Sequence, residues 1–184
     1  MKTKDCGRWI VLVVLCLGVL LLGACTTTTT TTPATPTTPA TPATVSDNLF
    51  RSIVIKAPVE KVFAYTIDPQ REMEWSFLKS WIILQGQGLG LTGDWTYELE
   101  GKVYQGQSVL VDYVPNQRIF YVSQGDIDST MIYLFSPVEG GTQMTWVLTY
   151  TCEPPAKMTK EELLKKTIEK LDNSMQKVKA ALEK

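Results

Sequence analysis

The stretch TQMTWVLTYTCEPPAKMTKEELLKKTIEKL, residues 142–171, decides the fold, because it holds the last strand of a sheet and the start of a long helix. From Met144 to Tyr150 every second residue is apolar or aromatic, and the residues between them are mostly polar. A period of two is typical of a strand that buries one face. Pro154 and Pro155 then end the strand, since proline cannot donate a hydrogen bond to a neighbouring strand.

A long C-terminal helix follows the two prolines. Thr159 and, three residues later, Glu162 form a capping box, which marks the helix start. Beyond it, apolar residues recur at alternating four- and three-residue steps, so they share one helical face. These residues are Leu164, Ile168, Leu171, Met175, Val178 and Leu182. Lysine and glutamate fill the other faces, and we therefore expect the apolar stripe to lie along the sheet.

Upstream, the pattern changes from a strand and short helices to a series of strands. Pro58 precedes turn-spaced apolar residues, which favours a short helix. The expected order is a strand at 53–55, this helix, a helical turn or two at 70–75, then strands at 81–84, 95–99, 103–113, 118–123 and 130–136. Antiparallel strands with helices segregated to one side make an α+β fold. A curved sheet around one long helix also leaves space between the two.

Four motifs carry a resemblance to a known family. They are SIVIKAPVEKVFAYTIDP at 52–69, GQGLG at 86–90, VDYVPNQRI at 111–119 and FSPVEGGTQMTW at 135–146. In this order they resemble the START-like (SRPBCC) superfamily of polyketide cyclases and dehydrases, lipid-transfer domains and birch-pollen-type allergens. The likeness covers essentially all of residues 45–184. It implies a helix-grip fold, in which an antiparallel sheet grips the C-terminal helix around a deep hydrophobic pocket. The motifs mark fold positions, so no catalytic residue is carried over.

The first 24 residues are predicted to be a lipoprotein signal peptide. Basic residues begin it, and an apolar run at 10–22 follows that is too short to cross a membrane comfortably. Gly23 and Ala24 precede Cys25, and the sequence around them resembles a bacterial lipobox. Cys25 is therefore predicted to carry the lipid. The alternatives are an ordinary signal peptide or an uncleaved anchor.

Residues 25–44 are predicted to form a tether that is rich in threonine and proline. Such a tract stays extended and solvated, because it has too little apolar surface to pack. We expect an exported protein held at the extracytoplasmic face of the cell membrane, or at an outer membrane, by the lipid on Cys25. The folded domain is predicted to span residues 45–184.

Composition excludes several classes of function. The 18 basic and 19 acidic residues nearly balance, and no basic stripe suits a nucleic-acid backbone. The chain has no histidine, the commonest general base and metal ligand, so no metal or cofactor is expected. Cys152, the one cysteine of the predicted domain, is interpreted as an inert residue at a strand end.

Candidate polar sites in the sequence have simpler interpretations. Glu98 and Glu100 are expected on the same, solvated face of a strand, opposite Trp95 and Tyr97. Asp126 and Asp128 fall in an expected loop, where turn formation explains them. The glycines of 86–90 lack the lysine and helix start of a phosphate loop, and are expected to connect two strands.

The candidate ligand pocket is a set of aromatic and methionine side chains. The set is Trp75, Trp81, Trp95, Tyr97, Met131, Tyr133, Phe135, Met144 and Trp146, with Trp75 expected near the mouth. Such a lining suits a lipid, isoprenoid or polyketide-like ligand, whose polar end the tyrosine hydroxyls would orient.

Three functions remain open at this point. The first is a surface-tethered carrier or sensor of a hydrophobic small molecule. The second is a cyclase- or dehydrase-type enzyme, in which Tyr97, Tyr133 or a buried carboxylate would act as acid or base. The third is a scaffold whose pocket is filled by its own side chains. The sequence leaves the ligand and the oligomeric state open.

Overall fold

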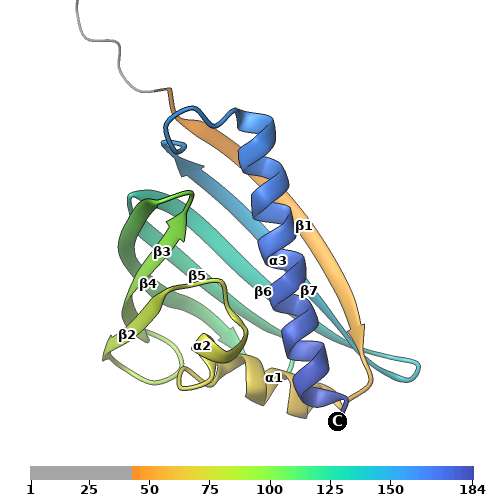
Figure 1. The fold of residues 1–184 in the computed structure, drawn as a ribbon. Helices are drawn as coiled ribbons and strands as arrows, with labels where there is room; N and C mark the ends of the chain where they lie inside the picture. The colour runs from red at the N-terminus through yellow and green to blue at the C-terminus, as the bar shows by residue number, and fades with distance from the viewer. Residues whose placement is uncertain (1–42) are drawn as a thin grey trace, which may run out of the picture. The chain divides into compact units, whose positions relative to one another are not determined.

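One antiparallel sheet of seven strands is packed against a long C-terminal helix in the computed structural model, which describes residues 43–184 (Figure 1). The predicted signal peptide, Cys25 and nearly all of the predicted tether lie outside the described residues. The elements are β1 (Val45–Ile55), α1 (Val59–Ile67), α2 (Glu72–Trp75), β2 (Ser80–Gln85), β3 (Thr92–Leu99), β4 (Lys102–Val114), β5 (Arg118–Gly125), β6 (Ile127–Val138), β7 (Gly141–Cys152) and α3 (Lys160–Leu182). Together they form the predicted α+β helix-grip fold.

The strand order is β1-β7-β6-β5-β4-β3-β2, so strands two to seven follow the chain and β1 joins the far edge. β1 pairs with β7 over its whole length, from Val45 opposite Cys152 to Ile55 opposite Thr142. It is much longer than the run predicted at 53–55. The reason is that β1 is an edge strand with exposed polar residues, such as Ser46 and Asn48, which hide its pattern.

The helix α3 begins as predicted. Thr159 accepts a hydrogen bond from the Glu162 backbone N–H (3.2 Å), and the Glu162 carboxylate accepts one from the Thr159 N–H (2.9 Å). The buried stripe differs at its start, because Leu163 is buried while Leu164 is only partly buried. Leu163, Thr167 and Lys170 lie on one flank of α3, four and three residues apart, and all three face the space between α3 and the sheet.

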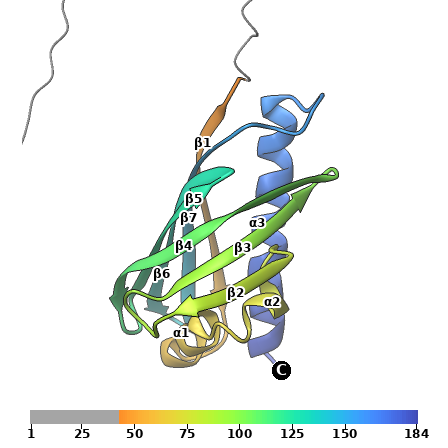
Figure 2. The ribbon, with the colours of Figure 1, turned by 90° about the vertical axis from the view of Figure 1, so that its left-hand side faces the viewer.

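The sheet curves so that β2, β3 and β4 cross over toward α3, whereas β1, β7 and β6 run along the helix (Figure 2). Ion pairing fixes α3 to the other edge of the sheet, since the Nε and Nη2 groups of Arg51 in β1 both donate to the Asp172 carboxylate. Lys179 also donates to the Val54 carbonyl oxygen (2.9 Å). One side of the sheet is thus tied to α3, while the other side curls over toward the helix and encloses a space beneath it.

Residues 40–184 form one compact unit, and the whole sheet and its hydrophobic core lie within it. A segment with its own complete core meets the requirement for folding as a separate domain. Within residues 43–184, no helix combines the length and apolar character needed to span a membrane.

Candidate ligand-binding cavity

A cavity of about 140 Å³ lies between the sheet, α2 and the N-terminal half of α3. Strands β2 to β7 all contribute to its wall, and so does the connection from α2 to β2. Neither β1 nor α1 does. The lining is mostly aromatic and aliphatic, which is the usual character of a small-molecule site.

Six of the nine side chains predicted for the pocket line this cavity. They are Trp75, Trp81, Trp95, Tyr97, Met131 and Tyr133. Trp75 was expected near the mouth, but only 1% of it is exposed. Its ring packs edge-on against Tyr133, with centroids 6.3 Å apart, because α2 folds back over the sheet. That a ligand occupies the space between these side chains stays a prediction.

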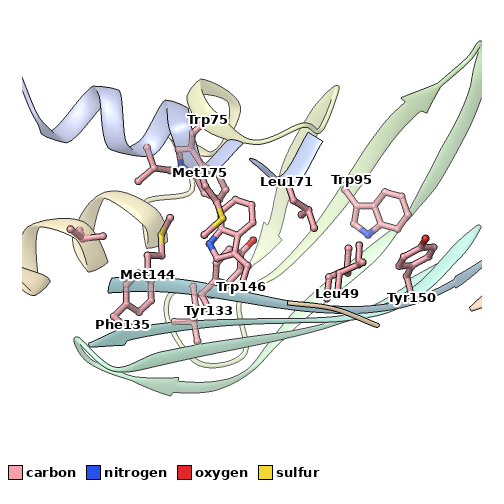
Figure 3. Packing of buried hydrophobic residues seen from close by; sticks show 14 of the residues in the cluster. Leu49, Trp75, Trp95, Tyr133, Phe135, Met144, Trp146, Tyr150, Leu171 and Met175 are labelled. Atoms are coloured by element: carbon pink, nitrogen blue, oxygen red, sulfur yellow. The ribbon is translucent and has the colours of Figure 1, made fainter. Parts of the chain in front are cut away.

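The other three predicted side chains lie outside the cavity, in the packed core. Figure 3 shows Met144 and Phe135 at the opposite end of the sheet from Trp95 and Tyr150, with Trp146 between them beside Tyr133. The rings of Phe135 and Phe63 are 5.2 Å apart, so α1 covers this end. The cause is position along the strand: alternation brings Trp146 to the inner face, but the helices above it leave no space there.

Two glycines give the indole rings their places in the wall. A Cβ on Gly106 would lie 2.5 Å from the Trp95 ring, and one on Gly93 would lie 2.7 Å from the Trp81 ring. Each indole therefore lies across the backbone of a strand where a side chain is missing. Larger residues at 93 and 106 would push the two rings into the cavity.

A row of hydroxyl groups crosses the floor of the cavity. Ser108, Ser123, Ser129 and Tyr150 are successive cross-strand partners on β4 to β7, and all four line the cavity. The Ser108 and Ser123 hydroxyls are hydrogen-bonded at 2.5 Å. The buried Tyr150 hydroxyl makes no hydrogen bond of good geometry among residues 43–184, although the Thr167 side chain on α3 lies near enough to oppose the rise in the Tyr150 pKa that burial causes. Because buried polar groups are almost always paired, this oxygen is a candidate contact for a ligand.

Three buried indole N–H groups also lack a partner among the described residues, and the one on Trp146 lies in the packed core. The Nε1 atoms of Trp75 and Trp95 have no acceptor within the described part of the chain, and both residues line the cavity. Indole nitrogen can only donate. A ligand with oxygen acceptors would satisfy these donors.

Glu72, at the start of α2, is the one carboxylic acid in the described cavity wall. Its carboxyl group makes no hydrogen bond or ion pair with any residue from 43 to 184. Glu72 is half-buried, and its apolar surroundings raise its pKa to about 8, which favours the uncharged acid at neutral pH. Burial, and next the nearby charge of Glu72 when ionised, raise the pKa of Tyr121 and Tyr133 as well. An uncharged acid and two phenols thus lie together at one end of the cavity.

One cationic side chain also reaches the described cavity wall. The Lys170 ammonium lies over the Tyr97 ring, 5.3 Å from its centroid. Burial raises the pKa of Tyr97, chiefly by penalising its charged form, so this phenol stays protonated. Lys170 makes no contribution to the shifted pKa of Glu72, whose cause is burial.

Sequence reasoning missed Glu72 and the hydroxyl row, for different reasons. Ser108 shares strand parity with Tyr104 and Leu110, both buried, so its inward direction was available from the pattern. Glu72 is the first residue of a four-residue helix, and its neighbours in the sequence, Arg71 and Met73, are exposed. So short a helix has no periodic pattern that would mark Glu72 as inward-facing. Only the tertiary fold brings it over the sheet.

The acidic pairs have structural roles. Glu98 is exposed and pairs with Lys79, as expected of a solvated residue. Glu100 was expected on the same strand face, but it lies in the turn after β3 with φ of 49° and pairs with Lys166 at 2.7 Å. The Asp126 carboxylate accepts the Gln105 N–H (2.9 Å), which secures a turn. Asp128 lies within β6, not in a loop, and accepts the Gly125 N–H.

Cys152 ends β7 and is buried in the wall of the cavity. Burial raises the pKa of its thiol, which disfavours the reactive thiolate. The interpretation as an inert strand-end cysteine fits this environment.

A curved antiparallel sheet around a C-terminal helix, with an apolar cavity between them, defines the helix-grip class of domains. The family described as "Polyketide cyclase / dehydrase and lipid transport" matches residues 48–183. The chain belongs to this family, within the SRPBCC superfamily that the four motifs indicated. No curated protein matches the sequence.

Solved structures share the fold at low sequence identity. An uncharacterized protein from Rhizobium leguminosarum is 19% identical, with a TM-score of 0.58 over 74% of this chain and 96% of that one. Ara h 8.0201 is 14% identical, with a TM-score of 0.57 over 75% of this chain and 98% of that one. The di-domain ARO/CYC StfQ from the steffimycin biosynthetic pathway is 14% identical, with a TM-score of 0.62 over 75% of this chain and 51% of that one.

Proposed function

We propose that the chain binds a hydrophobic small molecule of the lipid, isoprenoid or polyketide kind in the cavity, as a carrier or sensor. The observation that carries this proposal is an aromatic-lined space of about 140 Å³ beside unpaired polar groups. A protein interior that served only as a scaffold would be filled, because cores pack as densely as organic crystals. The space therefore argues against the filled-scaffold function.

The size of the cavity limits what it holds without rearrangement. An empty apolar cavity of about 150 Å³ takes up benzene. The present cavity thus matches roughly one aromatic ring with a short substituent. A longer polyketide, isoprenoid or lipid would require side chains of the wall to move apart. One-ring compounds are accordingly the right first probes.

Cumene (isopropylbenzene) is a suitable apolar probe, titrated into residues 40–184 and followed by NMR. Ser129→Phe places a ring in the cavity and breaks no hydrogen bond among the described residues, so we expect it to abolish cumene binding. Thr130→Phe is the matched control, because the next residue of β6 does not line the cavity. Equal cumene binding by both variants, or none by the parent, would count against the proposal.

We further propose that the lipid on Cys25 holds this domain at a membrane on the extracytoplasmic side. The support is the sequence before Cys25 and the Thr/Pro-rich segment after it. Metabolic labelling with a fatty acid tests this part separately. The parent protein should take up label and Cys25→Ser should not; label retained by the serine variant would contradict lipidation at Cys25.

A cyclase- or dehydrase-type reaction is the second candidate. Glu72 favours it, since an acid with a pKa of about 8 can both give and accept a proton near neutral pH. The test is deuterium incorporation into the methyl group of acetophenone in heavy water. An enzyme of this type would accelerate the exchange and Glu72→Gln would not, whereas a pure carrier would leave the rate at that of the buffer.

A further inference from the structure

Glu72 lies in the cavity wall with no partner of its own, and its surroundings indicate what it contacts. We propose that Glu72, as a carboxylic acid, donates a hydrogen bond to a carbonyl or hydroxyl oxygen of an uncharged aromatic ligand, which makes it the residue that selects the ligand's polar end. This inference rests on the proposed binding function and names the ligand class.

The geometry around Glu72 forms a polar corner in an aromatic wall. Tyr121 on β5 and Tyr133 on β6 line the cavity beside it, with ring centroids 6.3 Å apart and planes at 87°. Trp75, one turn after Glu72, closes the corner by packing edge-on against Tyr133. A flat ligand ring between these walls would direct its oxygen to the carboxyl group.

No charged group compensates a negative charge at Glu72. On its own turn, Arg71 lies 3.3 Å from the Asp68 carboxylate and 3.6 Å from that of Glu74. From α3, Lys170 lies over the Tyr97 ring. From the sheet, the facing titratable groups are the phenols of Tyr121 and Tyr133, whose pKa values burial raises. Glu72 is half-buried, and its ionised form would be a charge in an aromatic wall with no cation beside it, which favours the protonated acid.

A protonated acid favours an oxygen acceptor and disfavours an anion. Burying a ligand carboxylate in this corner would add a charge without a cation to pair with it. Free fatty acids are therefore disfavoured among hydrophobic ligands, and uncharged phenols and aryl ketones are favoured. The aromatic wall and the one-ring size of the cavity point the same way.

Three probes of matched size test this selection: cumene, acetophenone and benzoate, titrated into residues 40–184. At about pH 6.5 the protonated Glu72 donates to the ketone, so acetophenone should bind about fivefold more tightly than cumene. Benzoate should bind more weakly than acetophenone. At about pH 9.5 Glu72 is ionised and the phenols still protonated, so the preference for acetophenone over cumene should fall severalfold.

Two variants separate recognition from packing. Glu72→Gln keeps an N–H donor but cannot ionise, so it should retain the ketone preference at both pH values. Glu72→Leu, which has no donor, should lose the preference for acetophenone over cumene. Acetophenone preferred equally by Glu72→Leu and the parent, or benzoate bound most tightly, would overturn the assignment. Failure of the parent to bind cumene would instead reject the binding function itself.

Discussion

The fold has two kinds of aromatic residue, those in the packed core, such as Trp146, and those that border the cavity, such as Trp81. Trp146 is 1% exposed, and its ring centroid lies 5.0 Å from that of Tyr133. Trp146→Ala should cost about 3–5 kcal/mol of unfolding free energy, as loss of a core aromatic does. Denaturant melts measure this cost.

Trp81→Ala is the comparison, because this indole is only partly buried and borders the cavity. It should lose less stability than Trp146→Ala and should weaken cumene binding more. The reverse order for both quantities would mean that the cavity lies at the other end of the sheet.

The pKa of Glu72 makes a prediction for stability as well as for binding. The pKa of Glu72 is about 8 in the folded protein, whereas the ordinary pKa of a glutamate, as in the unfolded chain, is 4.5. Between these pH values the folded state therefore holds more protons than the unfolded state. The unfolding free energy should therefore fall as pH rises from about 4.5 to 8, by at most about 1.4 kcal/mol per pH unit.

Glu72→Gln removes this titration while preserving the shape of the side chain. Its unfolding free energy, measured in denaturant at several pH values, should vary less between about pH 5 and 8 than that of the parent. Parallel profiles for the two proteins would show that Glu72 ionises freely and is not held in an apolar corner.

At the scale of elements, the capping box of α3 is the clearest local signal. Thr159→Ala removes the side chain that accepts the Glu162 N–H, and should cost about 1 kcal/mol in a thermal or denaturant melt. Lys160→Ala, at the adjacent exposed position, is the control and should change little. A Thr159→Ala variant as stable as the parent would indicate that tertiary contacts alone fix the start of α3.

Elements with strong periodicity were predictable, and those with weak periodicity were not. The alternation from Met144 to Tyr150 and the helix stripe came directly from the residues. β1 was underestimated because an edge strand shows little alternation beyond residues 53–55. Leu164 was predicted to begin the buried stripe, but Leu163 is the buried residue. The twist of the sheet decides which flank of the helix is buried, and the spacing of apolar residues in the helix does not reveal that twist.

At the scale of the whole molecule, the fold was predictable and the shape of the cavity was not. Strand parity identified the inner face for all nine aromatic and methionine residues except Trp75, which lies on α2. Strand parity does not say which part of that face the helices cover, and here Phe63 of α1 packs on Phe135 and Trp75 of α2 packs on Trp146. Trp146 and Phe135 are therefore core, while Trp95 and Tyr97 border a cavity. Glu72 lies in the cavity wall only because the segment between α1 and β2 folds back over the sheet.

Native mass spectrometry of the protein purified from its own cells tests the central claim, that the cavity holds a hydrophobic small molecule, most directly. We predict an additional mass, released on unfolding, that belongs to a compact uncharged aromatic compound or a larger relative of one. The mass should be absent from Ser129→Phe and present in Thr130→Phe purified in the same way. A parent protein with no mass beyond that of its covalent chain that also fails to bind cumene would contradict the account.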